Sequence, residues 1–143
     1  MSVAKGVKVG TVMLIDDNEI DNLINQKMLE SVDLCETILV HTGAKSALEF
    51  LSNIEKISSK GADDCIPDII FLDLDMPLMD GFQFLEEYEK LSDKTKQKSK
   101  IFMLTSSINP QDLNRSKKSK YITKYLNKPL SGETMEKIRE SFS

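Results

Sequence analysis

A chain of 143 residues has the length of one domain and is long enough to bury a hydrophobic core. Its 19 basic and 23 acidic side chains leave a net charge of −4, which argues against a protein that binds nucleic acid by neutralising phosphates. Cys35 and Cys65 are too few for a disulfide framework, and the chain has neither a signal-peptide core nor a membrane-spanning apolar run. We therefore expect a cytoplasmic protein that binds neither nucleic acid nor a membrane.

Short apolar runs alternate with segments of helical periodicity along the chain. The apolar runs predict strands at residues 9–15, 37–40, 69–72, 100–105 and 122–126. Helical spacing and capping residues predict helices that begin after Asn18, near Ala44, at Gly81, at Pro110 and after Ser131. This alternation predicts a parallel sheet covered by helices on both faces, because parallel strands need crossover connections.

Two segments between or within these elements carry further expectations. In the first helix, Ile20, Leu23, Ile24 and Met28 recur at helical spacing, so we expect them to face the core. Residues 58–67 are rich in small and polar side chains and predict a surface loop.

Polar side chains follow several of the predicted strands. Asp16 and Asp17 come directly after the first strand, Asp73 follows the third, Thr105 ends the fourth, and Lys128 lies just beyond the fifth. Right-handed crossovers bring the carboxyl ends of all the strands to one edge of the sheet, so these side chains should converge. Gathered carboxylates need a cation, and hard oxygen ligands suit Mg²⁺. With a hydroxyl and an ammonium beside them, they could accept a phosphoryl group as an aspartyl phosphate.

Four sequence blocks in order carry a family resemblance: LIDDNEID, PDIIFLDLDMPLMDG, IFMLTSS and YLNKPL. Each block alone is weakly specific, but together they resemble the receiver domain of two-component response regulators of the chemotaxis-regulator type. The resemblance implies a flavodoxin-like, doubly wound α/β fold with a five-stranded parallel sheet in the order 2-1-3-4-5 and five helices. It covers the chain as a single domain, residues 1–143, with its core at about residues 9–142.

The resemblance also implies roles for individual residues. Asp73 matches the phosphoacceptor. Mg²⁺ would be bound directly by Asp17, through water by Asp16, and also by Asp73 and the Asp75 main-chain carbonyl. The roles implied beyond the acidic residues are a switch hydroxyl at Thr105, a phosphate-pairing lysine at Lys128, an aromatic that turns inward on activation at Tyr125, and positions that tune the phosphate lifetime at Asp75 and Ser107.

The implied partners are proteins. The donor would be a histidine of a sensor kinase or of a histidine phosphotransfer protein. Output would pass by contact through the helix that begins at Pro110, the strand at residues 122–126 and the last helix. Because the chain stops at Ser143, just after that helix, we expect a stand-alone signalling domain rather than an enzyme. The resemblance also allows a homodimer that depends on phosphorylation.

The chain departs from the family pattern at two places. Ser106 stands where the family often has alanine, and Ser119, Lys120 and Tyr121 replace the small residues common before the fifth strand. The cationic run at residues 115–120 predicts a solvated helix face or a partner-docking surface. Asp80 and Gly81 favour a helix cap and turn over a ligand, and His41 has no partner motif.

Three other functions remain as alternatives. The DLDMP stretch resembles the signature of haloacid-dehalogenase-type phosphatases, with Asp73 as nucleophile and Asp75 as acid/base. Against this, Pro77 stands where Thr or Val is wanted and no acid pair follows Lys128. A phosphorylation-independent binding module of the same fold is a second alternative. A flavodoxin-type cofactor binder would need a Ser/Thr/Gly-rich phosphate loop where Asp16 and Asp17 stand.

Overall fold

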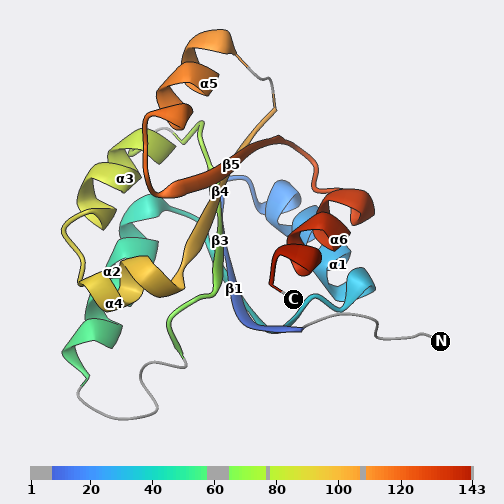
Figure 1. The fold of residues 1–143 in the computed structure, drawn as a ribbon, viewed down its shortest axis with the longest axis horizontal. Coiled ribbons are helices and arrows are strands. Elements are labelled where there is room, and N and C mark those ends of the chain that lie inside the picture. The colour runs from blue at the N-terminus through green and yellow to red at the C-terminus, as the bar shows by residue number, and fades with distance from the viewer. Residues whose placement is uncertain (1–7, 58–64, 77, 107–108, 143) are drawn as a thin grey trace.

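The computed structural model describes residues 8–57, 65–76, 78–106 and 109–142, so most of the loop predicted at residues 58–67 lies outside it. Five strands in the described residues form one parallel sheet in the order β2-β1-β3-β4-β5, as predicted (Figure 1). The strands are β1 (Val9–Ile15), β2 (Cys35–His41), β3 (Ile69–Asp73), β4 (Lys100–Thr105) and β5 (Ile122–Asn127).

Six helices occur in the described residues, so the prediction of five was wrong by one. They are α1 (Glu19–Val32), α2 (Ala44–Lys56), α3 (Gly81–Tyr88), α4 (Asp93–Lys98), α5 (Pro110–Lys117) and α6 (Gly132–Ser141). The additional helix is α4, whose sequence DKTKQK contains no apolar residue. A helix without an apolar stripe gives no hydrophobic period for sequence analysis to detect.

A carboxylate from a distant helix stabilises α4 instead. One oxygen of Glu55, near the end of α2, accepts hydrogen bonds from the Ser92 main-chain N–H at 2.8 Å and the Ser92 hydroxyl at 2.9 Å. The same oxygen accepts from the Thr95 hydroxyl at 2.7 Å. Ser92 is the N-cap of α4, so this negative charge lies at the end of the helix where a charge of that sign is favourable.

Glu55→Ala should therefore destabilise the protein by about 1–3 kcal/mol, because three donors lose their acceptor. Urea unfolding of the variant measures this loss. Glu49→Ala, an exposed acid on the same helix, is the matched control and should change the free energy of unfolding by less than about 0.5 kcal/mol. Equal losses in the two variants would contradict the capping role of Glu55.

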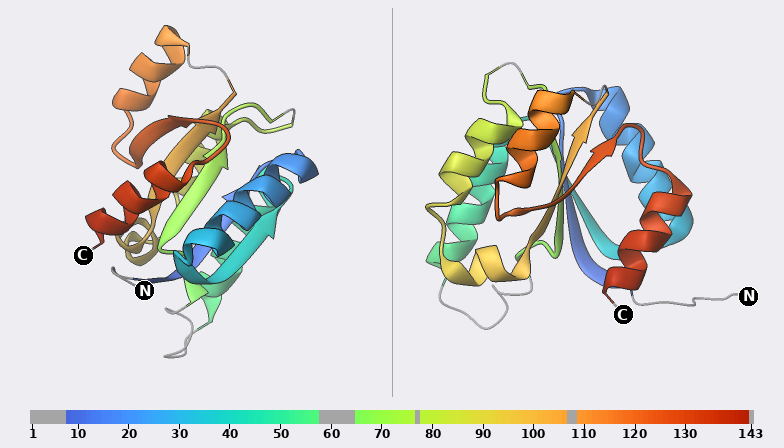
Figure 2. Two further views of the ribbon diagram at one scale, coloured as in Figure 1. Left: turned by 90° about the vertical axis from the view of Figure 1, so that its right-hand side faces the viewer. Right: turned by 45° about the horizontal axis from the view of Figure 1, so that its top comes forward.

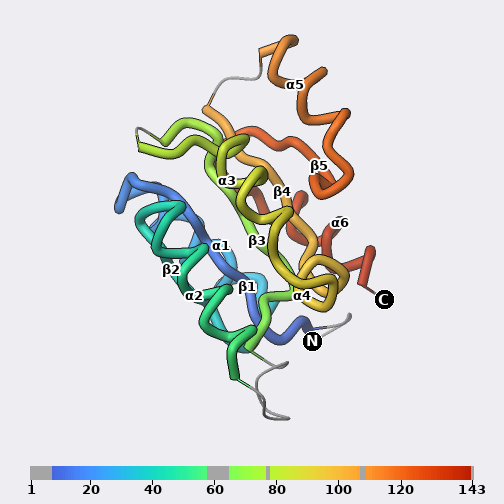
Figure 3. The backbone as a smooth tube through the Cα atoms, turned by 90° about the vertical axis from the view of Figure 1, so that its left-hand side faces the viewer, coloured from blue at the N-terminus to red at the C-terminus, as the bar shows by residue number. Residues whose placement is uncertain are grey.

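The helices cover both faces of the sheet, and Figure 2 shows the two layers from other sides. Alternate residues of β1 point to opposite faces, as in any strand. Val12 and Leu14 pack in a cluster with α1 and α6, whereas Met13 and Ile15 pack in a second cluster with α2 and α3. The tube in Figure 3 shows α2, α3 and α4 along one side of the sheet. None of the described helices is both long and apolar enough to cross a membrane.

The face of α1 that packs against the sheet is not the face that the sequence predicts. Ile20, Leu23 and Ile24 are 68, 53 and 45% exposed instead of buried. Met28 packs partly against the core, so only the end of the predicted apolar face reaches it. We call Ile20, Leu23 and Ile24 the α1 apolar surface.

The buried side of α1 carries amides, which explain its orientation. The Asn22 side-chain amide donates to the Asp16 main-chain carbonyl at 2.8 Å. The Asn25 side-chain oxygen accepts from the Leu130 main-chain N–H at 3.3 Å. Because a buried main-chain group without a partner costs about 1–3 kcal/mol, these bonds favour the amide side of the helix against the sheet.

Candidate functional site

Two buried aspartates lie side by side at the edge of the sheet. Strands β1 and β3 pair in parallel with Ile15 opposite Leu72, so the following residues, Asp16 and Asp73, are level with each other. Each of the two aspartates is only 2% exposed. The convergence predicted for these strand ends is therefore present.

Lys128 joins the two acids. Its Nζ lies 2.6 Å from Asp16 Oδ2 and 3.1 Å from Asp73 Oδ1, and its side chain is 11% exposed. A third carboxylate, Asp21 in the first turn of α1, lies 3.0 Å from the same Nζ. Sequence analysis missed Asp21, although it stands in the first turn of the helix that follows Asp16 and Asp17 and so could reach the same site.

The charges of this cluster shift the pKa of two of its members. Burial, and next the neighbouring Asp16 carboxylate, raise the pKa of Asp73 to about 6, against the opposing effect of Lys128. Burial alone would lower the pKa of Lys128, but hydrogen bonds to Asp16, Asp21 and Asp73 outweigh it and raise that pKa. The ammonium therefore stays charged and offsets the negative charge of the three carboxylates around it.

Three carboxylates at this edge could hold a metal ion. Asp16, Asp17 and Asp73 each offer an oxygen, and these oxygens lie within 4.8 Å of one another. The donors are hard oxygens, and the exposed Asp17 leaves one side open to water, which suits an ion that keeps several waters. The residues present thus fit Mg²⁺.

Gly81, the first residue of α3, packs closely against the end of β3 and the residue after it. A Cβ on Gly81 would lie 3.1 Å from Leu74 Cα and 3.1 Å from Met103 Cε, so a larger residue would push the turn away from the sheet. Asp80 caps α3, with its carboxylate accepting from the Gln83 N–H at 2.9 Å and the Gln83 side chain accepting from the Asp80 N–H at 2.9 Å. The predicted cap and turn at Asp80 and Gly81 are confirmed.

The residues predicted to form a switch lie on β4 and β5, on the side of β3 that faces away from β1. Thr105 is 1% exposed, and its hydroxyl donates to Asp75 Oδ2 at 3.3 Å. Tyr125 is buried in the core cluster of α2 and α3. Burial, and next the Asp112 carboxylate, raise the pKa of Tyr125, and Asp75 contributes to the rise. Ser107 lies outside the described residues.

A cavity of about 540 Å³ opens beside these residues. Its lining includes the carboxylates of Asp17, Asp75, Asp80 and Asp112, and the guanidinium of Arg115. The solvent-accessible opening beside the site is therefore lined by both negative and positive side chains.

Comparison with known proteins covers nearly the whole chain. A sequence model of the response regulator receiver domain matches residues 12–140. The chain is 35% identical over 127 residues to "Sensor histidine kinase CheAY" of Helicobacter pylori, and the matched segment covers 89% of this chain and 14% of that protein. It is 38% identical over 96 residues to "Hybrid signal transduction histidine kinase L" of Dictyostelium discoideum, covering 67% of this chain and 5% of that protein. The chain thus matches one segment of these much longer relatives.

Solved structures share the fold over a similar extent. A two-component response regulator from Cytophaga hutchinsonii superposes with a TM-score of 0.83 at 25% identity, covering 94% of this chain and 97% of that one. A response regulator receiver protein from Dyadobacter fermentans gives a TM-score of 0.78 at 26% identity, covering 94% and 98%.

Proposed function

The chain belongs to the response regulator receiver domain family, and from that membership we propose that it accepts a phosphoryl group on Asp73 in two-component signalling. The observation that carries the proposal is the contact of Lys128 with both Asp16 and Asp73 at the edge of the sheet. Receiver domains act as signalling modules, so we propose that the described residues work as one such module. The chain has only two cysteines, Cys35 and Cys65, too few for the disulfide framework of a secreted domain, which supports a cytoplasmic location.

The proposed reaction moves one phosphoryl group. An Asp73 carboxylate oxygen attacks the phosphorus, an O–P bond forms, and the bond from phosphorus to the donor nitrogen or oxygen breaks. Lys128 would pair with the phosphoryl oxygens once they arrive, since its ammonium already lies beside Asp73. Bound Mg²⁺, held by Asp16, Asp17, Asp73 and the main-chain carbonyl of Asp75, would supply further positive charge.

We propose that Asp75 holds the Thr105 hydroxyl before phosphorylation. In the unphosphorylated protein its carboxylate holds the Thr105 hydroxyl at 3.3 Å. A phosphoryl group on Asp73 would offer that hydroxyl a second, stronger acceptor. We propose that the hydroxyl moves from Asp75 to the phosphate, and that output then passes to a target protein through the face formed by α5, β5 and α6.

The phosphodonor would dock on the α1 apolar surface. Large exposed side chains that cluster on one helix mark a site for a partner. This surface is continuous with the acidic site, because Asp21, between Ile20 and Leu23, contacts Lys128. A histidine-bearing helix of a sensor kinase or phosphotransfer protein could pack on the surface while its histidine reaches Asp73. Both sequence relatives described above are histidine kinases by name, which fits a donor of this kind.

Leu23→Asp should reduce phosphotransfer from a kinase at least about tenfold while leaving phosphorylation by acetyl phosphate unchanged, because only the protein donor needs the α1 apolar surface. The measurement is the transfer rate from an autophosphorylated histidine kinase selected from a panel for transfer to the wild-type chain. Ile57→Asp, which charges another exposed hydrophobic position, is the control and should transfer normally. Equal slowing with acetyl phosphate would contradict docking as the cause.

The proposed function itself is tested without a partner. Intact-protein mass after incubation with acetyl phosphate should show one phosphoryl adduct that requires Mg²⁺. Steady release of inorganic phosphate without an adduct would favour the phosphatase alternative. Neither adduct nor release would favour a phosphorylation-independent binding module.

A further inference from the structure

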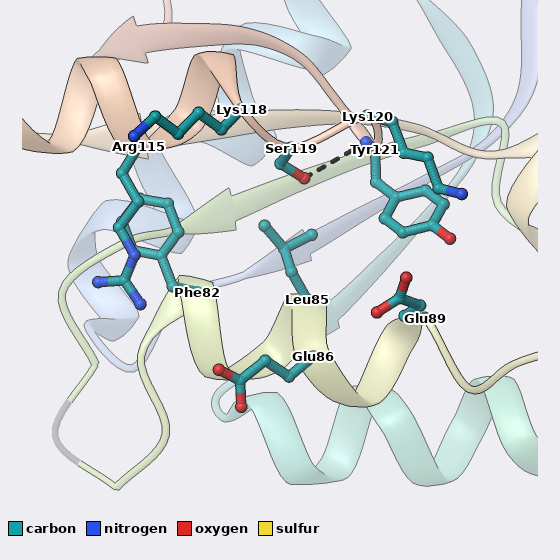
Figure 4. A pocket seen from close by; sticks show the side chains of 9 residues that line it. All are labelled: Phe82, Leu85, Glu86, Glu89, Arg115, Lys118, Ser119, Lys120 and Tyr121. Carbon is teal, nitrogen blue, oxygen red and sulfur yellow. Dashed lines mark hydrogen bonds between the residues drawn. The ribbon is translucent and has the colours of Figure 1, made fainter.

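A groove of about 420 Å³ separates α3 from the connection between α5 and β5 (Figure 4). The wall formed by α3 and its C-cap residue carries two exposed acids, Glu86 and Glu89. The opposite wall carries three exposed cations, Arg115, Lys118 and Lys120. The groove thus has a negative wall and a positive wall that face each other.

The two walls do not neutralise each other. No ion pair joins either acid to any of the three cations in the part of the chain that the structure describes. Two of the cations lie instead against aromatic rings. The Arg115 guanidinium lies 4.0 Å from the centre of the Phe82 ring, and Lys120 Nζ lies 5.2 Å from the centre of the Tyr121 ring. Glu86 and Glu89 therefore remain available to an outside cation.

The base of the groove is apolar. Leu85 of α3 is 7% exposed and points into the groove between the charged walls, and Tyr121 borders it at the other end. An apolar base with charged rims is the usual construction of a protein–protein contact. The departure from the family pattern at residues 119–121 supplies part of this surface, since Lys120 and Tyr121 replace small residues there.

We propose that this groove is a contact surface for a second copy of the same chain. A two-fold axis that runs along the groove brings the negative wall of one copy over the positive wall of the other, and the reverse at the same time. Both walls are then satisfied in one symmetric contact. A purely acidic peptide would be repelled by Glu86 and Glu89, and a purely basic one by the three cations. Self-pairing is the simplest partner that matches both signs.

The proposal is independent of phosphorylation at Asp73, so its test uses unphosphorylated protein. Sedimentation equilibrium over a concentration series compares the wild type with Glu86→Lys/Glu89→Lys and with Lys118→Glu/Lys120→Glu. Each double variant makes the two walls alike in charge, so its dimer dissociation constant should rise at least about tenfold. A 1:1 mixture of the two variants should form a heterodimer, because a positive groove then meets a negative one. The variant with all four substitutions should recover self-association.

A charge-matched control separates this groove from other surfaces. Glu133→Lys/Glu140→Lys changes the net charge by the same amount on exposed positions of α6. It should leave the dimer intact. A wild type that stays monomeric throughout the series would overturn the proposal, and so would a mixture that forms no heterodimer. Loss of the dimer in the α6 variant alone would assign self-association to the face of α5, β5 and α6 instead.

Discussion

Asp73→Asn should abolish the stable phosphoryl adduct and leave the protein folded. The amide has nearly the same shape as the carboxylate but lacks the oxygen nucleophile that forms an acyl phosphate. Intact-protein mass after incubation with acetyl phosphate and Mg²⁺ measures the adduct directly. Asp75→Asn is the matched control, because it removes an exposed carboxylate two residues away and should still take up one phosphoryl group. An adduct on the Asp73 variant would mean that another residue is the acceptor.

The same substitution should have an effect on stability that depends on pH when Mg²⁺ is removed by EDTA. The pKa of Asp73 is raised from 3.8 to about 6 on folding, because burial and Asp16 disfavour its charged form. The favourable protonated form is fully present below about pH 4 and is lost as the pH rises through about 6, so the wild type loses stability across that window. Asp73→Asn has no such proton to lose. Its free energy of unfolding should therefore exceed that of the wild type above pH 6, and the gain should shrink toward pH 4.

Lys128→Ala should destabilise the protein by about 3–5 kcal/mol in EDTA, because it leaves the two buried carboxylates of Asp16 and Asp73 without their cation. Saturating Mg²⁺ should recover part of this loss, since the metal offers another positive charge to the same oxygens. The variant should also fail to couple phosphorylation to the switch, as seen in a spectral change on phosphorylation that the wild type shows and the variant lacks. Urea unfolding with and without Mg²⁺ gives the stability values.

Lys124→Ala is the control for this prediction. Lys124 lies on β5, the strand that Lys128 directly follows, but its side chain is exposed, so its loss should change stability by less than about 0.5 kcal/mol with or without Mg²⁺. A Lys128 variant as stable in EDTA as this control would show that Asp16 and Asp73 do not need the ammonium. A loss that Mg²⁺ fails to reduce would argue against metal binding by these carboxylates.

The sheet could be predicted from the sequence because each strand carries its own signal. The strands at residues 9–15 and 100–105 begin and end where the apolar runs do. Helix α4 could not be predicted, since its stabilising contact comes from Glu55, 37 residues before Ser92. The buried face of α1 was predicted wrongly for a related reason, because a tertiary contact decides it. Hydrophobicity ranks Ile20 above Asn22 for burial, but the hydrogen bond from Asn22 to main chain outweighs that preference.

The sequence determines the positions of the acidic site residues more completely than the contacts of the switch residues. Asp16 and Asp73 follow neighbouring parallel strands, and this topology alone brings them together. Asp21 was missed because it lies in the first turn of α1 and not at the end of a strand, so the order of the strands does not place it beside Lys128. The hydrogen bond between Thr105 and Asp75 also depends on the path of the chain after β3, which strand patterns do not specify. Side chains on strand ends were thus predictable, whereas those on helices and turns depended on tertiary contacts.

One main-chain hydrogen bond makes the site open to direct observation. The Lys128 N–H donates to the Thr105 carbonyl at 2.8 Å, so the end of β4 and the lysine of the site share a rigid link. Amide chemical shifts respond to small changes in hydrogen-bond length. The Lys128 amide signal in a nitrogen-15 NMR spectrum should therefore move whenever Thr105 moves, and it offers a reporter of the switch that needs neither a dye attached near the site nor a known partner.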